Sequence, residues 1–179
     1  MPKFKDIPQF ISSGNYSTDI PWDYLEDWLN KDRIGKKIDL NPDFQRGHVW
    51  SKKKQIDYIE YILSGGICSN NIMWNCPGWM IDYKGPFQLV DGKQRLESVR
   101  KFLRNELKAF GYYYSEYEDK LKITHYYFKM HVNNLPTREN VLKWYLQLNS
   151  GGVVHSIIEI RKVERLLEYE RNKQQSENS

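Results

Sequence analysis

Hydrophobic residues recur at helical spacing in five segments of the chain, and most of these segments carry a start or stop signal. We expect helices at residues 20–30, 51–63, 96–103, 137–149 and from 156 onward. The expected N-caps are Asp19, Ser51, Thr137 and Ser156, the last of which forms a capping box with Glu159. The glycine pair at 65–66 is expected to end the second helix.

The runs between these helices are alternating or continuously apolar, which predicts strands. They are residues 37–40, short pieces within 67–83, residues 87–90, and the stretch 107–134 around three consecutive tyrosines. Because no internal repeat or linker is visible, the pattern predicts a single α+β domain. We place an irregular lead-in at residues 1–18, the domain at 19–170 and a polar tail at 171–179.

The composition excludes two classes of protein. Of the 179 residues, 40% are hydrophobic and 28% are charged, so the chain is too apolar to be intrinsically disordered. No apolar run approaches the roughly 20 residues of a membrane-spanning helix, and the N-terminus lacks the apolar stretch of a signal peptide. We therefore expect a cytoplasmic protein with no membrane segment. The two cysteines cannot complete a zinc site alone, and the four histidines are scattered.

The chain is mildly basic and rich in aromatic residues. Its net charge is +4, and aromatic residues make up 15% of the sequence. Aromatic side chains interleaved with cations can form a surface on which bases stack and phosphates pair. A tyrosine-rich core beneath an ordinary mixed-charge surface gives the same composition, and the low net charge favours this second interpretation.

The strongest local motif is Asp91-Gly92-Lys93-Gln94-Arg95, which lies between an expected strand and an expected helix. A glycine at such a turn lets the backbone approach a ligand, and the free amides at a helix start attract anions such as phosphate. Lys93 and Arg95 add positive charge, while Asp91 suits a metal ion or the ordering of the turn. In the alternative interpretation Asp91 caps the helix, Arg95 pairs with a neighbouring acid, and nothing binds.

Two further segments carry candidate binding residues. The loop at 41–50 contains Gln45 and Arg46, and Lys52–Lys54 follow in the first helical turn, where cations oppose the helix dipole. This clustering indicates an anionic partner, although a solvated lysine face explains the three lysines equally well. The turn at 148–153, with two consecutive glycines, either presents amides to a ligand or simply connects two helices.

Four blocks of sequence occur in an order that resembles a known family. They are Pro42–Arg46 with Val49-Trp50, residues 55–65, Leu89–Leu96, and Leu148–Gly152. The chain resembles the N-terminal domain of GmrSD-type modification-dependent restriction enzymes, a family marked by an Asp-Gly-Gln-Gln-Arg motif. The resemblance covers most of residues 37–165 and implies a ParB/sulfiredoxin-like fold that binds and hydrolyses nucleotides.

The resemblance also implies roles for individual residues. Catalysis would fall to Asp91, Gln94 and Arg95, and Asp91 would also hold Mg²⁺. Nucleotide binding would involve Phe44, Gln45, Arg46, Gly92, Lys93 and Asn149. Two departures matter: Lys93 replaces the first glutamine of the motif, and no segment resembles the C-terminal His-Asn-His nuclease domain of those enzymes. We therefore do not expect this chain to cleave DNA by itself.

The expected function is the binding of a nucleoside triphosphate, with weak hydrolysis, in a restriction or anti-phage system. Two alternatives remain open. The domain could bind DNA through Lys52, Lys53 and Lys54 together with Arg46. It could instead be a non-enzymatic partner or decoy of a separately encoded restriction nuclease.

Overall fold

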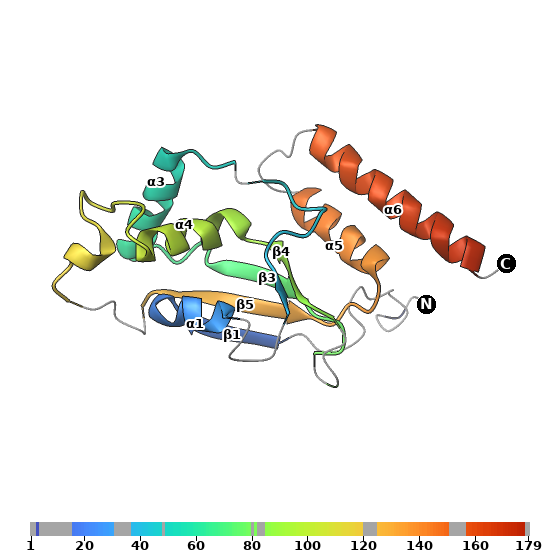
Figure 1. The fold of residues 1–179 in the computed structure, drawn as a ribbon, viewed down its shortest axis with the longest axis horizontal. Coiled ribbons are helices and arrows are strands. Elements are labelled where there is room, and N and C mark those ends of the chain that lie inside the picture. The colour runs from blue at the N-terminus through green and yellow to red at the C-terminus, as the bar shows by residue number, and fades with distance from the viewer. Residues whose placement is uncertain are drawn as a thin grey trace.

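A five-stranded mixed sheet forms the centre of the fold (Figure 1). This computed structural model describes residues 3, 16–30, 37–47, 49–79, 81, 85–119, 125–150 and 157–177. The strands lie in the order β1 (Tyr16–Pro21), β5 (Tyr127–Asn133), β3 (Asn71–Asn75), β4 (Phe87–Asp91) and β2 (Ile38–Asp39). Strand β5 runs antiparallel to β1 and parallel to β3, while β4 runs antiparallel to β3 and parallel to β2.

Helices pack on this sheet, which confirms the predicted α+β class. They are α1 (Leu25–Leu29), α3 (Lys52–Leu63), α4 (Lys93–Leu103), α5 (Arg138–Ser150) and α6 (Ile157–Glu177), with short 3₁₀ turns η2 (Trp22–Tyr24) and η3 (Tyr114–Glu116). Figure 1 shows α5 and α6 side by side, and α3 next to α4. None of the described helices is long and apolar enough to cross a membrane.

The alternation of side chains along the strands divides the core in two. On β3, Ile72 and Trp74 point into a large cluster with residues of α1, α3 and α4, whereas Met73 packs against a smaller cluster with α5 and α6. Successive side chains of a strand lie on opposite faces, so each face acquires its own helical cover. Strand β4 contributes to both clusters and runs directly into helix α4, which places the Asp91–Arg95 turn between the two cores.

Several predicted boundaries are confirmed by their caps. The Ser51 side chain accepts a hydrogen bond from the Lys54 amide at the start of α3, as expected for an N-cap. Gly65 has φ = +91° just after that helix, and Thr137 Oγ1 accepts from the Asn140 amide at the start of α5. These are local signals, and the sequence alone was sufficient to find them.

Two predictions are wrong, the second of them only in part. Residues 20–30 do not form one helix capped by Asp19, because Tyr16–Pro21 is an edge strand that pairs with β5, and only a 3₁₀ turn and a five-residue helix follow. The strands expected over 107–134 are confirmed only in the last part, as β5; around Tyr112–Tyr114 the described residues contain the 3₁₀ turn η3 and one isolated bridge between Ala109 and Tyr112. For residues 16–21, pairing with β5 overrides the local pattern.

The ends of the predicted domain can be followed only in part. Residues 16–18 of the expected lead-in belong to strand β1, and residues 171–177 of the expected tail continue helix α6, where the side chains of 171–176 are exposed. Ser156 of the predicted capping box, the glycines of the 148–153 turn, and Leu121 and Ile123 lie outside the described residues.

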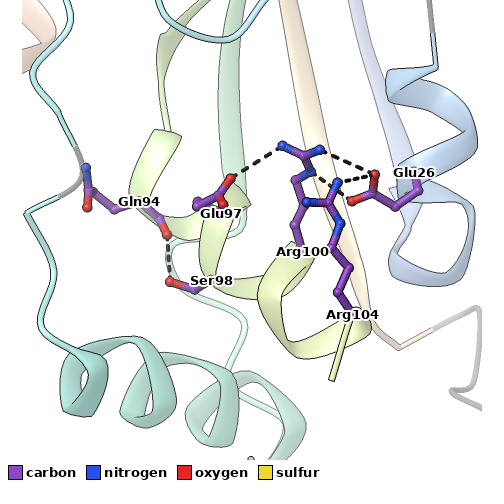
Figure 2. A network of polar contacts seen from close by, with 6 residues as sticks. All are labelled: Glu26, Gln94, Glu97, Ser98, Arg100 and Arg104. Atoms are coloured by element: carbon purple, nitrogen blue, oxygen red, sulfur yellow. Dashed lines mark hydrogen bonds and ion pairs between the residues drawn. The ribbon is translucent and has the colours of Figure 1, made fainter. Parts of the chain in front are cut away.

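A network of ion pairs joins α1 to α4 on the side of α4 facing away from Gln94 (Figure 2). The Glu26 carboxylate accepts from Arg100 Nε at 2.8 Å and from Arg104 Nη2 at 2.8 Å, and Arg100 also lies 3.4 Å from Glu97. Burial raises the pKa of Glu26, but the hydrogen bonds and charges of the two arginines outweigh this effect and lower the pKa below its usual value.

This network predicts a stability that depends on pH. Because the pKa of Glu26 is lower in the folded chain, its contribution is complete above the ordinary carboxylate pKa and disappears as pH falls through the folded value. The Glu26 side chain is 41% exposed, so we expect Glu26→Gln to lower the free energy of unfolding by about 1 kcal/mol or less at neutral pH. Urea unfolding at neutral pH and at acidic pH checks this: the wild type and the variant should differ only at neutral pH.

Candidate functional site

A cleft of about 190 Å³ opens where the end of β4, the start of α4 and the end of α5 meet the loop before α3. The facing loop is defined here as residues 45–47 and 49–50. Nine of the residues predicted from the sequence line the cleft: Gln45, Arg46, Lys54, Asp91, Gly92, Lys93, Gln94, Arg95 and Asn149. Segments far apart in the sequence therefore converge as the motifs predicted.

Gly92 makes the turn from β4 into α4. Its φ is +100°, a left-handed conformation that favours glycine, and it occupies the N-cap position of α4 without any side-chain capping bond among the described residues. A Cβ at this position would lie 2.5 Å from Ile72 Cδ1 and 3.3 Å from the Asn71 carbonyl oxygen. The sheet thus touches the turn directly, and the helix start faces the cleft without a side-chain cap.

Asp91 and Arg95 form an ion pair across the first turn of α4. Arg95 Nη2 lies 2.7 Å from Asp91 Oδ2 and also donates to the Asn71 carbonyl at 2.9 Å. This pairing was one half of the alternative interpretation of the motif; its other half, a helix capped by Asp91, is wrong, because Gly92 is the N-cap. Arg95 Nε is buried and has no hydrogen-bond partner among the described residues. The guanidinium is therefore anchored at one nitrogen and retains unused donors.

The side chains of Lys93 and Gln94, in the middle of the motif, bond to the facing loop. Gln94 is 8% exposed; its Oε1 accepts from the amides of Val49 and Trp50 at 3.0 and 3.1 Å, and its Nε2 donates to the Gly47 carbonyl at 3.0 Å. Lys93 Nζ donates to the Arg46 carbonyl at 3.2 Å. Burial lowers the pKa of Lys93, and the charges of Glu97 and Asp39 partly oppose this effect.

The facing loop is also held from its own side. Gln45 Nε2 donates to the Leu89 carbonyl at 2.5 Å, and Arg46 Nη1 lies 3.9 Å from the Glu159 carboxylate of α6. Phe44 is 2% exposed and packs edge-on against the Tyr145 ring of α5 at 5.2 Å. The predicted ligand contact of Phe44 does not fit this burial: the ring supports Tyr145 from behind and does not line the cleft.

The three lysines at the start of α3 divide into two groups. Lys54 lines the cleft, and its ammonium lies 5.1 Å from the centre of the Trp50 ring. Lys52 and Lys53 do not line it, and Lys53 pairs with Asp57 one turn along α3 at 2.7 Å. An exposed i,i+4 pair of this kind is typical of a solvated helix face.

At the opposite wall, helix α5 contributes Tyr145, Leu148 and Asn149. Asn149 Nδ2 donates to the Tyr145 carbonyl at 2.7 Å, so its side-chain oxygen and its second N–H are the groups it can offer to a ligand. Burial raises the pKa of Tyr145 to about 12, and the phenol therefore stays neutral at physiological pH.

The charge in the cleft is strongly unbalanced. Four cationic side chains line it, Arg46, Lys54, Lys93 and Arg95, against a single carboxylate, Asp91. No group of three or more His, Cys, Asp or Glu side chains able to hold a metal ion occurs in the described part of the chain. Asp91 alone fits only the arrangement usual for Mg²⁺, in which one carboxylate, water and the phosphates of a nucleotide share the ion.

Four residues that line the cleft had no predicted role in binding, namely Trp50, Val90, Tyr145 and Leu148, and two of them are aromatic. Trp50 lies within a motif block, but its aromatic ring carried no role there, and Tyr145 was interpreted as a member of a helical face. Neither position has a local signal that separates a wall residue from a core residue. Only the packing of α5 against the facing loop brings the two together.

Comparisons with known proteins agree with the motifs. The model of the family described as GmrSD restriction endonuclease, N-terminal domain, matches residues 25–166. This range includes every residue that lines the cleft. No curated protein and no solved structure gives a significant match.

Proposed function

Because the chain belongs to the family of GmrSD restriction endonuclease N-terminal domains, we propose that it acts in a restriction system by binding a nucleoside triphosphate in this cleft. The observation that carries the proposal is the excess of four cations over one carboxylate at the uncapped start of an 11-residue helix. Helix amides and cations together favour a multiply charged anion.

The chemistry of the cleft suggests an orientation for the nucleotide. Phosphates would lie against the α4 amides and the guanidinium of Arg95, which lines the cleft and suits an anion with several oxygens. Trp50 and Tyr145 on the other walls are aromatic and suit the base or sugar. The residues available for hydrolysis are few: with Mg²⁺ bound to the phosphates, Asp91 would hold the ion and Arg95 would stabilise developing negative charge.

A thermal-shift panel tests the proposal. The four nucleoside triphosphates, with and without Mg²⁺, are compared with the same concentrations of nucleoside. Ligand at 100 times its dissociation constant stabilises the fold by about 2.7 kcal/mol, which such a scan detects easily. A panel in which no triphosphate raises Tm contradicts the proposal, and a shift without phosphate release assigns binding without hydrolysis.

Asp91→Asn separates the two roles of this carboxylate. The Asp91 carboxylate repels the triphosphate and competes with it for Arg95. Its removal should therefore strengthen the binding of metal-free triphosphate severalfold. The same change should abolish Mg²⁺-dependent phosphate release. Calorimetric titrations with and without Mg²⁺ measure the first effect; weaker binding of the metal-free nucleotide would assign Asp91 a purely structural role.

Binding of DNA remains the second candidate, and the geometry supports it less. Of the three lysines on which it rested, only Lys54 shares a surface with Arg46. Affinity for DNA falls steeply with salt because many phosphates release counterions, whereas the affinity for a single nucleotide in a cleft depends on salt more weakly.

A separately encoded nuclease subunit would be the partner that couples nucleotide binding to cleavage. Co-purification with that subunit tests this role.

A further inference from the structure

We infer that Lys93 and Gln94 are positioning residues: their side chains hold the facing loop beside the start of α4 and do not contact the nucleotide. The inference rests on the proposed function, because it separates the cleft residues that contact the nucleotide from those that only position the loop. In this division Gly92, Arg95 and the α4 amides face the ligand from the helix, and Arg46 and Trp50 face it from the loop.

The side-chain amide of Gln94 is already hydrogen-bonded to the facing loop. It makes three hydrogen bonds to the facing loop, two through Oε1 and one through Nε2, out of the four that such an amide can make. Its side chain is buried, and Figure 2 shows it pointing away from the Arg100 network. A ligand could engage this amide only by displacing its bonds to the Val49 and Trp50 amides and to the Gly47 carbonyl.

Lys93, the preceding residue, has the same role. Its ammonium donates to the Arg46 carbonyl, so it fixes the main chain of the residue whose side chain reaches into the cleft. A glutamine, which is the residue of the family motif, also carries an N–H donor at this position. The lysine of this chain therefore preserves the donor and adds a charge that acts on the ligand at a distance.

The two ends of the facing loop have independent anchors. Gln45 binds the Leu89 carbonyl, and the buried Gln55 of α3 donates to the Trp50 carbonyl at 2.9 Å. The amides and carbonyls between these anchors find their partners on Lys93 and Gln94. Without them, the loop loses four main-chain hydrogen bonds, and the 3.9 Å pair with Glu159 is left to hold Arg46 in position relative to Arg95.

The first experiment needs no nucleotide. Trypsin cleaves after Arg46, and cleavage there requires the loop to leave the α4 start. Gln94→Leu should accelerate cleavage at the Arg46–Gly47 bond about tenfold, with cleavage after Arg100, inside helix α4, as the monitor of global unfolding. The matched control is Ser98→Ala, which removes a buried hydrogen bond to the Gln94 carbonyl on the same helix without touching the loop. Equal cleavage after Arg46 in Gln94→Leu and in the control overturns the inference.

A double-mutant cycle then tests the role in binding. If Gln94 acts through the loop, Gln94→Leu weakens triphosphate affinity about tenfold in the wild type but adds little to Arg46→Ala. Fully additive losses mean that Gln94 contacts the ligand directly, and the inference fails. If the wild type binds no triphosphate, the proposed function fails. The trypsin result still decides whether Lys93 and Gln94 hold the facing loop against α4.

Three further variants guard against a loss of folding. Gln94→Glu keeps the acceptor for the Val49 and Trp50 amides and loses only the donor to Gly47, so its cleavage rate should lie between those of the wild type and Gln94→Leu. Lys93→Gln restores the family residue and should keep the loop closed, whereas Lys93→Met should open it. A loop that opens equally in Lys93→Gln and Lys93→Met contradicts the assigned role of Lys93.

Discussion

Gly92→Ala is expected to lower the free energy of unfolding by about 2–6 kcal/mol and to abolish triphosphate binding. The left-handed backbone, at φ = +100°, costs a non-glycine residue about 1–3 kcal/mol. The new methyl group would also lie 2.5 Å from Ile72 Cδ1, and Ile72 is completely buried, so its side chain has little room to move. Overpacking of this kind costs a further 1–3 kcal/mol or so.

Gly65→Ala is a matched control for this variant. Gly65 has a similar φ of +91°, but a Cβ there would meet no atom within 4 Å. Gly65→Ala should therefore show only the conformational cost, roughly 1–2 kcal/mol, and bind triphosphate normally. Chemical denaturation measures both variants, and the difference between them is the cost of the contact with the sheet. Equal losses would show that the turn at Gly92 does not need its close approach to β3.

The sequence predicts best those elements that local signals define. Helix α3 has a serine cap, a buried stripe and a glycine stop, and the helix that follows Asp91 starts beside its motif. Edge strand β1 escapes such reasoning because its pairing partner, β5, lies more than a hundred residues away. The same spacing of Trp22, Leu25 and Leu29 that suggested a helix serves to bury these side chains in a 3₁₀ turn and a short helix.

For the site, the sequence predicts which residues meet but not what each of them does. The family resemblance carried by the order of the motifs predicted that Arg46, Lys93, Arg95 and Asn149 share one site, and all four line the cleft. The motifs could not reveal that the Gln94 side-chain amide bonds to the facing loop, because this depends on the positions of Gly47 and Trp50 in the folded chain. Nor could they place Phe44 behind Tyr145, since a buried aromatic and a ligand-stacking aromatic look alike in a sequence.

Arg95→Ala is expected to weaken triphosphate binding by about 1.5–3 kcal/mol, or roughly ten- to a hundredfold, the value of a hydrogen bond to a charged group. The guanidinium lines the cleft at the helix start, and its position is fixed by Asp91 and by the Asn71 carbonyl. Lys101→Ala, on the same helix but outside the cleft, removes the same charge and should change affinity only slightly. Calorimetric titration at two salt concentrations measures both variants.

The loss in Arg95→Ala has two sources, because removal of the arginine also leaves Asp91 unpaired in the cleft. Measuring Arg95→Ala in the Asp91→Asn background isolates the contact with the ligand, since the exposed carboxylate is then absent. We expect most of the loss to persist there. If instead the double variant binds as tightly as Asp91→Asn alone, the arginine serves only to neutralise Asp91, and phosphate recognition must rest on the α4 amides with Arg46 and Lys54.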